Sequence, residues 1–288
     1  MVASAEVAAE VRALAEAGDG PGALALVARV WREVWFTPGD VDGGAAAAAA
    51  ALDAPGADQT SVDRARVLYA DHLFAFRAAD HERARVRAEE CLRVAREARD
   101  LRGECDGLTG LARVAFRDGD YDRVVELARE GRAKAQAVGD RAAEAGPLHL
   151  EAAGTRLGGD QAAARELYTR SLELARELGN EGTVANELHN LGWVELHLGN
   201  LEAAGGRFRE YEQAANAAHH RPWLELDRAG IAAARGDLDE ARARLAAGER
   251  LIAEAGLAQD PDDQYELDWL RAAVGRLVPP SAPSQERG

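Results

Sequence analysis

Apolar side chains recur every three or four residues along most of this chain, which is the spacing of one face of an α-helix. The clearest row consists of Leu188, Leu191, Val194 and Leu198. Good helix formers such as alanine, leucine, glutamate and arginine dominate the composition, and runs of β-branched residues are nearly absent. The pattern therefore predicts an all-α protein.

Short polar turns separate these helices at a constant interval. Gly119-Asp120, Gly159-Asp160 and Gly199-Asn200 lie 40 positions apart (159 − 119 and 199 − 159), and a second series contains Gly139-Asp140 and Gly179-Asn180, 40 apart again. Glycine can end a helix in the left-handed conformation, and Asp or Asn can accept hydrogen bonds from the N–H groups that open the next one. Two interleaved series predict a right-handed α-solenoid of stacked antiparallel helix pairs.

The turns divide the chain into five expected segments. These are an N-terminal helix pair at 1–36, a linker with a short alanine-rich helix at 37–60, a repeat array at 61–256, a capping helix at 257–277 and a disordered tail at 278–288. The linker is expected because TPGDVDGG and DAPGADQT flank an alanine run, which offers little apolar area to bury.

The stretch LHNLGWVELHLGNLEAAGGRFREYEQAA resembles a tetratricopeptide repeat (TPR), with Leu188, Leu191-Gly192, Ala204 and Phe208 at positions of the signature. The stretch LYTRSLELARELGNEGTVANELHNLGWVELHLGN is similar to the 40-residue repeats of bacterial signalling ATPases and antibiotic-pathway regulators. This resemblance covers about 61–256 and implies a TPR-like fold. The chain departs from the family in its period and in Glu195, which occupies a position that is usually apolar or tyrosine. The sequence shows no ATPase motif, so the resemblance implies the repeat module alone.

Charge and cysteine content exclude several classes of function. The formal net charge of −15 argues against nucleic acid as a partner, because phosphate binding needs clustered positive charge. Cys91 and Cys105 are too few for a disulfide framework and lack metal-site spacing, so a reducing cytoplasm is expected. The N-terminus does not have the pattern of a signal peptide. No apolar stretch approaches membrane-spanning length, so no membrane partner is expected.

Candidate binding residues gather on one predicted helix. In proteins that resemble this one, the first helix of each pair lines a concave groove. The helix at 181–198 carries polar and aromatic residues opposite its leucine row, and steps of 40 residues reach equivalent positions on earlier helices. The predicted groove consists of Arg113, Arg117, His149, Arg156, Asn186, His189, Asn190, Trp193 and His197. Arginine could bind carboxylate or phosphate there, and tryptophan could supply an apolar or cation–π platform.

Two functions follow from this groove. The first is a non-enzymatic scaffold or regulatory module that binds a protein or peptide segment, with an acidic segment suiting the arginines. The alternative is a small-molecule enzyme or sensor that binds an anionic metabolite, with His149 or His189 as general acid or base. Pairing of the arginines with nearby acids in a solvated network would leave neither site. Self-association through the apolar cluster at 30–36, giving a homo-oligomer, is a further alternative to packing of that cluster under 37–60.

No cofactor or metal is expected. The sequence contains no glycine-rich phosphate loop and none of the spaced motifs of a hydrolase or zinc protease. His189 and His197 are two helical turns apart, about 12 Å by helical rise, and cannot share one ion.

Overall fold

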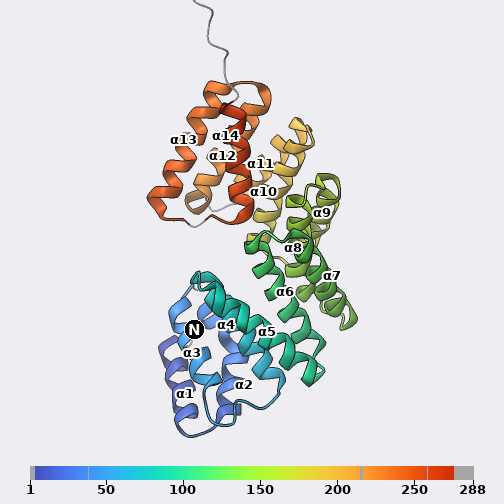
Figure 1. Cartoon of the computed structure of the whole chain (residues 1–288). Coiled ribbons are helices and arrows are strands. Elements are labelled where there is room, and N and C mark those ends of the chain that lie inside the picture. The colour runs from blue at the N-terminus through green and yellow to red at the C-terminus, as the bar shows by residue number, and fades with distance from the viewer. Residues whose placement is uncertain (1–3, 38, 215–216, 258, 276–288) are drawn as a thin grey trace, which may run out of the picture. The chain divides into compact units, whose positions relative to one another are not determined.

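The structure is a computed structural model that describes residues 4–37, 39–214, 217–257 and 259–275. Every regular element in these ranges is a helix, which confirms the predicted all-α fold (Figure 1). The chain forms two compact units, Met1–Gly158 and Gly159–Gly288, and each unit is described separately below.

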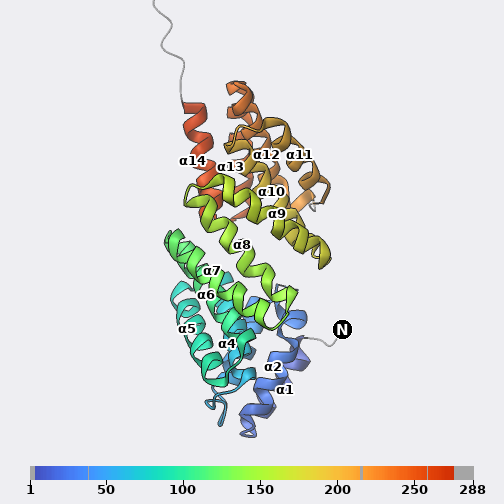
Figure 2. The same cartoon turned by 90° about the vertical axis from the view of Figure 1, so that its right-hand side faces the viewer.

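Unit 1 contains eight α-helices and one π-helical turn among its described residues. They are α1 (Ser4–Glu16), α2 (Gly20–Trp31), η1 (Arg32–Phe36), α3 (Val41–Leu52), α4 (Val62–Arg77), α5 (His81–Ala98), α6 (Leu101–Asp118), α7 (Tyr121–Ala137) and α8 (Arg141–Leu157). From α4 onward each helix packs on the next, and the first helices of neighbouring pairs also touch, α4 with α6 and α6 with α8 (Figure 2). This nearest-neighbour stacking is the arrangement that the repeat predicts.

Unit 2 continues the same arrangement. It contains α9 (Gln161–Glu177), α10 (Glu181–His197), α11 (Leu201–Ala214), α12 (Ala217–Arg235), α13 (Leu238–Ala255) and α14 (Pro261–Gly275). Consecutive helices from α9 to α13 are packed neighbours, and α10 also touches α12. The last helix, α14, contacts both α12 and α13, just as α6 contacts α4 and α5 in unit 1.

The predicted turns have the predicted geometry. Gly119 ends α6 with φ +77°, and the side chain of Asp120 accepts a 3.1 Å hydrogen bond from the N–H of Arg123. One period later Gly159 has φ +100°, and Asp160 accepts from the N–H of Ala163 over 3.0 Å. Each turn therefore closes one helix and caps the next, which is why the dipeptide recurs.

The alanine run forms a packed helix within unit 1. Asp40 caps α3 by accepting a 3.0 Å hydrogen bond from the N–H of Gly43, and Ala48 and Ala51 are completely buried. A side chain at Gly44 would place its Cβ 2.3 Å from the ring of Phe74 on α4. The small residues thus permit a close approach, so the alanine run is a packed part of unit 1 rather than a linker.

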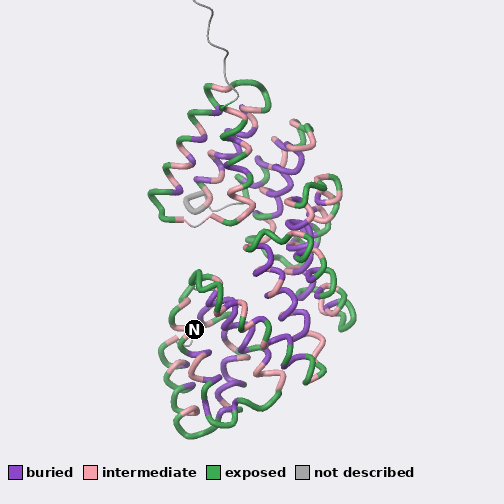
Figure 3. Tube along the Cα trace, viewed as in Figure 1, coloured by how far each residue is buried: buried purple, intermediate pink, exposed green. Residues whose placement is uncertain are grey.

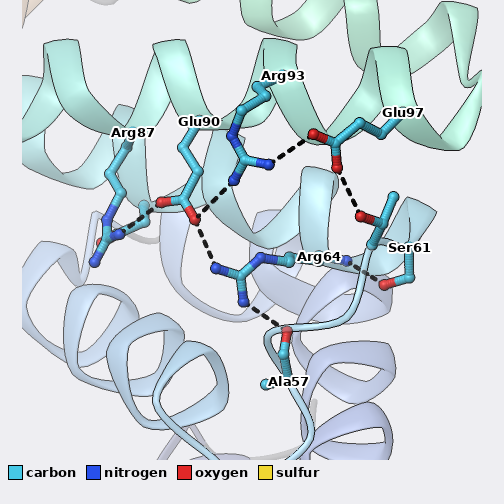
Figure 4. A network of polar contacts seen from close by, with 9 residues as sticks. Ala57, Ser61, Arg64, Arg87, Glu90, Arg93 and Glu97 are labelled. Carbon is cyan, nitrogen blue, oxygen red and sulfur yellow. Dashed lines mark hydrogen bonds and ion pairs between the residues drawn. The ribbon is translucent and has the colours of Figure 1, made fainter.

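Arg64 on α4 is the centre of a polar network that fastens the segment after α3 to α5 (Figure 4). Its Nη1 donates a 2.6 Å hydrogen bond to the carbonyl oxygen of Ala57, and its Nη2 lies 2.6 Å from Oε1 of Glu90. Glu90 also pairs with Arg87 at 3.0 Å. Because Arg64 and Glu90 are both largely shielded from water, this pair is worth more than an exposed surface pair.

The apolar cluster at 30–36 lies inside unit 1. Trp35 is completely buried and Trp31 nearly so, and both belong to the same core as α3 and α4. Figure 3 shows how buried and exposed positions alternate along the helices. The ring of Trp31 meets Phe36 and Phe74 edge to face, with centroids 5.4 and 6.3 Å away. These contacts agree with packing of the cluster, and Trp35 has no exposed surface for a homo-oligomer interface.

Candidate binding surfaces

A cavity of about 440 Å³ lies among the first helices of unit 1. The end of α2 and the start of η1 supply Trp31 and Arg32, α4 supplies Tyr69, and α6 supplies Arg102 and Asp106. The cavity therefore combines two aromatic rings with charged groups of both signs. Its volume is within the range of small-ligand pockets, and it also suits one or two side chains of a bound peptide.

Arginines next to this cavity are oriented by aromatic rings. Arg77, the last residue of α4, has its Cζ 3.5 Å from the ring centroid of Phe36, and its Nη1 donates a 2.7 Å hydrogen bond to the carbonyl oxygen of Phe36. Arg32 has its Cζ 4.5 Å from the ring centroid of Trp31. Such cation–π contacts leave guanidinium donors free for a ligand.

Two arginines on α6 extend the same surface. Arg117 has its Cζ 5.4 Å from the ring centroid of Phe76. Burial, with the neighbouring positive charge of Arg113 as a second cause, lowers the pKa of Arg77. Among the described residues, no carboxylate oxygen lies within 4.0 Å of Arg32, Arg77 or Arg113. We call the following set the arginine–aromatic surface: Trp31, Arg32, Phe36, Tyr69, Phe76, Arg77, Arg113 and Arg117.

The carboxylates at the edge of the cavity are already occupied. Arg102 forms an ion pair with Asp106 over 3.2 Å and another with Asp140. Burial raises the pKa of Asp106 to about 6, against the opposing charge of Arg102. The positive charge of Arg32 also acts on Asp106 and opposes the effect of burial on its pKa, so this acid offsets part of the charge of the arginine–aromatic surface.

Part of this surface was predicted from the sequence. Arg113 and Arg117 belong to the predicted groove, and steps of 40 residues back from His189 also reach Tyr69. The other rings of the surface (Trp31, Phe36 and Phe76) and Arg32 were missed. The 40-residue step was the available signal for Arg77, because it is the position one period before Arg117.

The other two predicted residues of unit 1 lie on α8, where His149 is half-buried and Arg156 is completely buried. The expectation that Arg156 faces a ligand is therefore wrong, because its side chain has no exposed surface.

In unit 2, α14 contacts three of the predicted groove residues of α10, namely His189, Trp193 and His197. The Nδ1 of His189 lies 3.1 Å from Oδ1 of Asp227 on α12, and its Nε2 lies 3.3 Å from Oε2 of Glu266 on α14. Burial alone would lower the pKa of His189, but these two carboxylates outweigh it and hold the pKa well above its usual value. A histidine that keeps its proton between two buried acids is a poor general base, which removes one form of the enzyme alternative.

The remaining predicted residues of α10 divide between interior and surface. Trp193 is completely buried and Asn190 is 4% exposed, whereas Asn186 is exposed and His197 is half-buried. The ring centroid of His197 lies 5.3 Å from that of Tyr265 and 5.5 Å from that of Trp269, both on α14. The prediction of Trp193 as an open platform is wrong, because α14 and the packed helices exclude solvent from its indole.

Comparison with models of protein families finds no match, and comparison with characterised protein sequences finds none either. Solved structures do match. A Rap protein complexed with Competence and Sporulation Factor superposes with a TM-score of 0.58 at 15% identity, over 93% of this chain and 80% of that one. PilF of Pseudomonas aeruginosa gives 0.56 at 13% identity, over 88% and 98%. The chain has a TPR-like fold. Identities this low establish the fold alone, so the function of this TPR-like chain rests on its own surfaces.

Two further features limit the possible sites. Within the described ranges, no helix is long and apolar enough to cross a membrane. In the same ranges, the only three-residue group of potential metal ligands is Asp260, Asp262 and Asp263, whose carboxylates meet at the start of α14. Burial and the charges of Asp262 and Glu266 raise the pKa of Asp263 to about 8.

Proposed function

We propose that this protein is a non-enzymatic TPR-like scaffold, and that unit 1 binds an acidic segment of a partner protein on the arginine–aromatic surface. The observation that carries the proposal is the gathering of Arg32, Arg77 and Arg113, with no carboxylate oxygen of the described residues within 4.0 Å, beside a cavity lined by Trp31 and Tyr69. Guanidinium groups bind carboxylates in forked geometry, and the rings give an apolar contact for neighbouring side chains.

The distribution of charge supports an acidic ligand. The chain has a formal net charge of −15, and elsewhere in unit 1 arginines are held by acids, as in the pairs of Arg64 and Arg87 with Glu90. The arginine–aromatic surface is an exception, where positive charges lie beside one another. The lowered pKa of Arg77 is partly a sign of that repulsion. A bound carboxylate would relieve it, so binding is favoured both by new contacts and by neutralisation.

Structural neighbours make a peptide ligand reasonable for this fold. A Rap conjugation gene regulator of the plasmid pLS20, solved in complex with the Phr* peptide, superposes with a TM-score of 0.56 at 12% identity, over 93% of this chain and 79% of that one. The Rap protein described above was solved with Competence and Sporulation Factor. Peptide binding comes to this chain as part of the proposal, because the shared fold alone does not carry it.

The test is fluorescence anisotropy with two labelled octapeptide probes, Glu-Glu-Phe-Glu-Glu-Phe-Glu-Glu and its glutamine counterpart. We expect the acidic probe to bind at least about tenfold more tightly to the whole chain and to weaken as salt is raised. The double variant Arg77→Ala/Arg113→Ala should lose at least about tenfold in affinity, since two charge-assisted contacts would be removed.

The matched control is Arg93→Ala on α5, which removes an exposed arginine held by Glu97 at 2.9 Å. This variant should bind the acidic probe as the wild type does. Equal affinity for the acidic and glutamine probes, or an unchanged affinity in the double variant, would contradict the proposal.

A further inference from the structure

Unit 2 contains a cavity of about 350 Å³ whose lining comes from α11, α12 and α13. Its apolar part includes Phe208 and Leu224, which are both buried, and Ile231. Gly205 on α11 also borders the cavity and leaves space that a side chain would occupy. The volume is within the range of small-ligand pockets, and the apolar part provides a surface on which a ring can pack.

Four arginines line this cavity, and two of them are already paired with acids. Nη2 of Arg228 lies 2.6 Å from Oε1 of Glu212, and Arg244 contacts two acids at 2.7 and 2.9 Å. Arg209 and Arg235 are different, because both are exposed and no carboxylate oxygen of the described residues lies within 4.0 Å of either. Their guanidinium groups therefore offer forked donors to a carboxylate.

The lining also contains four acids, so its formal charge is balanced. Three of these acids have partners within the fold. Glu212 and Glu240 hold the paired arginines, and Asp237 caps α13 by accepting a 3.2 Å hydrogen bond from the N–H of Glu240. Binding of an anion at Arg209 and Arg235 thus depends on their local lack of partners, and not on an excess of positive charge.

The fourth acid, Asp227, is 2% exposed and is the most deeply buried charged group of the lining. Its Oδ1 lies 3.1 Å from His189 and accepts a 2.9 Å hydrogen bond from Trp193. Its Oδ2 is buried and has no hydrogen-bond partner in the part of the chain that the structure describes. A buried acceptor without a donor is costly, so a ligand that supplies the donor gains affinity.

We propose that this cavity binds a small hydroxyaryl carboxylate. The carboxylate pairs with Arg209 and Arg235 at the exposed rim, the ring packs on Phe208 and Ile231, and the hydroxyl donates to Oδ2 of Asp227. Small side-chain shifts, which are common on binding, open this oxygen to the ligand. The ligand follows from the lining, which has cations at the rim, an apolar middle and an acceptor inside. The site does not depend on the arginine–aromatic surface of unit 1.

Three small probes separate the parts of this recognition. They are para-hydroxyphenylacetate, phenylacetate, which lacks the hydroxyl, and tyrosol, which has an alcohol in place of the carboxylate. In titration calorimetry with the whole chain, we expect para-hydroxyphenylacetate to bind with a dissociation constant below about 1 mM. Phenylacetate and tyrosol should each bind at least about tenfold more weakly, because each lacks one charge-assisted contact.

Two neighbouring glycines of α11 provide a steric test with a matched control. A Cβ at Gly205 meets only Nη1 of Arg209, a flexible end, at 3.4 Å, so Gly205→Leu fits the helix and fills part of the cavity. Gly206 does not line the cavity and has no atom within 4 Å of the same built position. Affinity for para-hydroxyphenylacetate should fall at least about tenfold in Gly205→Leu and stay unchanged in Gly206→Leu. Circular dichroism verifies that both variants are folded.

The arginines are tested in the same way. The double variant Arg209→Gln/Arg235→Gln should lose at least about tenfold in affinity for para-hydroxyphenylacetate. Its control, Arg207→Gln/Arg250→Gln, removes the same charge from two arginines that are outside the lining and are held by acids at 3.5 and 3.8 Å. The control should bind as the wild type does.

Four results would overturn the proposal. The first is no heat of binding with para-hydroxyphenylacetate up to about 10 mM, a concentration at which even weak small ligands bind. The second is equal affinity for phenylacetate, which would remove Asp227 from the site. The third is unchanged affinity in Gly205→Leu, with a loss in Arg77→Ala/Arg113→Ala instead, which would place the probe on unit 1. The fourth is loss of binding of the acidic octapeptide in Gly205→Leu, which would make a peptide the occupant.

Discussion

The indole of Trp193 donates a 2.9 Å hydrogen bond from its Nε1 to Oδ1 of Asp227, joining α10 to α12. The same carboxylate lies 3.1 Å from His189. Since Trp193 is completely buried and Asp227 is 2% exposed, neither group has water as an alternative partner. The interior of unit 2 therefore depends on a polar contact as well as on apolar packing, and each of its members can be tested separately.

Replacement of Trp193 by phenylalanine tests this hydrogen bond. Trp193→Phe keeps an aromatic ring beside Phe208 but removes the N–H, so Asp227 loses one of its donors. We expect the free energy of unfolding to fall by about 2 kcal/mol, the usual effect of losing a hydrogen bond to a charged group. Urea unfolding followed by circular dichroism measures it. Trp269→Phe, whose indole is only partly buried, is the control and should cost less.

The seating of α14 should depend on pH. The folded state holds a proton on His189, whose pKa is raised by Asp227 and Glu266 against burial, and on Asp263, whose pKa of about 8 results from burial and from Asp262 and Glu266. Both groups have a higher pKa in the folded chain than in the unfolded chain. Their contributions to the stability of the seated α14 are therefore complete at low pH and are lost as the pH rises. For Asp263 the window runs from about 4 to about 8, and for His189 it begins above about 6.5.

We therefore expect α14 to open more easily between pH 6 and pH 9, by about 1 kcal/mol per pH unit where one proton is released. Deuterium exchange of α14 amides, corrected for the intrinsic pH dependence of exchange, measures this locally. Asp263→Asn cannot ionise and should flatten the curve. An opening free energy that stays constant over this range would show that His189 and Asp263 do not control α14.

The sequence predicted the repeat because its turns depend on local chemistry. A glycine with positive φ followed by Asp or Asn works in the same way at Gly119-Asp120 and at Gly159-Asp160, regardless of what surrounds it. Helix pairs and their stacking order then follow. The burial of α3 could not be predicted in this way, because it depends on one close approach, between Gly44 and Phe74, that is distant in sequence.

The site was harder to predict than the fold for a similar reason. A stripe containing His189 and Trp193 looks the same whether it faces a ligand or another helix of the chain, and α14 lies outside the period that ordered the other helices. Arg113 was identified because it falls within that period. The rings that orient its neighbours, such as Phe36, come from the irregular η1 turn and have no repeat equivalent.

Close packing between α10 and α11 can be tested with two glycines. A Cβ at Gly192 would lie 2.2 Å from the ring of Phe208, so Gly192→Ala must displace that ring and should cost about 1–3 kcal/mol. Gly206 on α11 has no atom within 4 Å of the same built position, so Gly206→Ala should instead stabilise the helix by up to about 1 kcal/mol. If this packing is correct, the midpoint temperature of thermal unfolding falls in Gly192→Ala and rises in Gly206→Ala.

Arg113 provides a test that separates binding from stability. Its Nε is buried without a hydrogen-bond partner among the described residues, and its charge repels Arg77. Arg113→Met keeps most of the volume while removing the charge, so the free energy of unfolding should stay the same or rise by about 1 kcal/mol. Affinity for the acidic octapeptide should fall in the same variant. If Arg113→Met loses both stability and affinity, Arg113 supports the fold of α6 rather than a ligand. If the variant is more stable but binds the octapeptide less tightly, Arg113 is a recognition residue that costs the fold some stability.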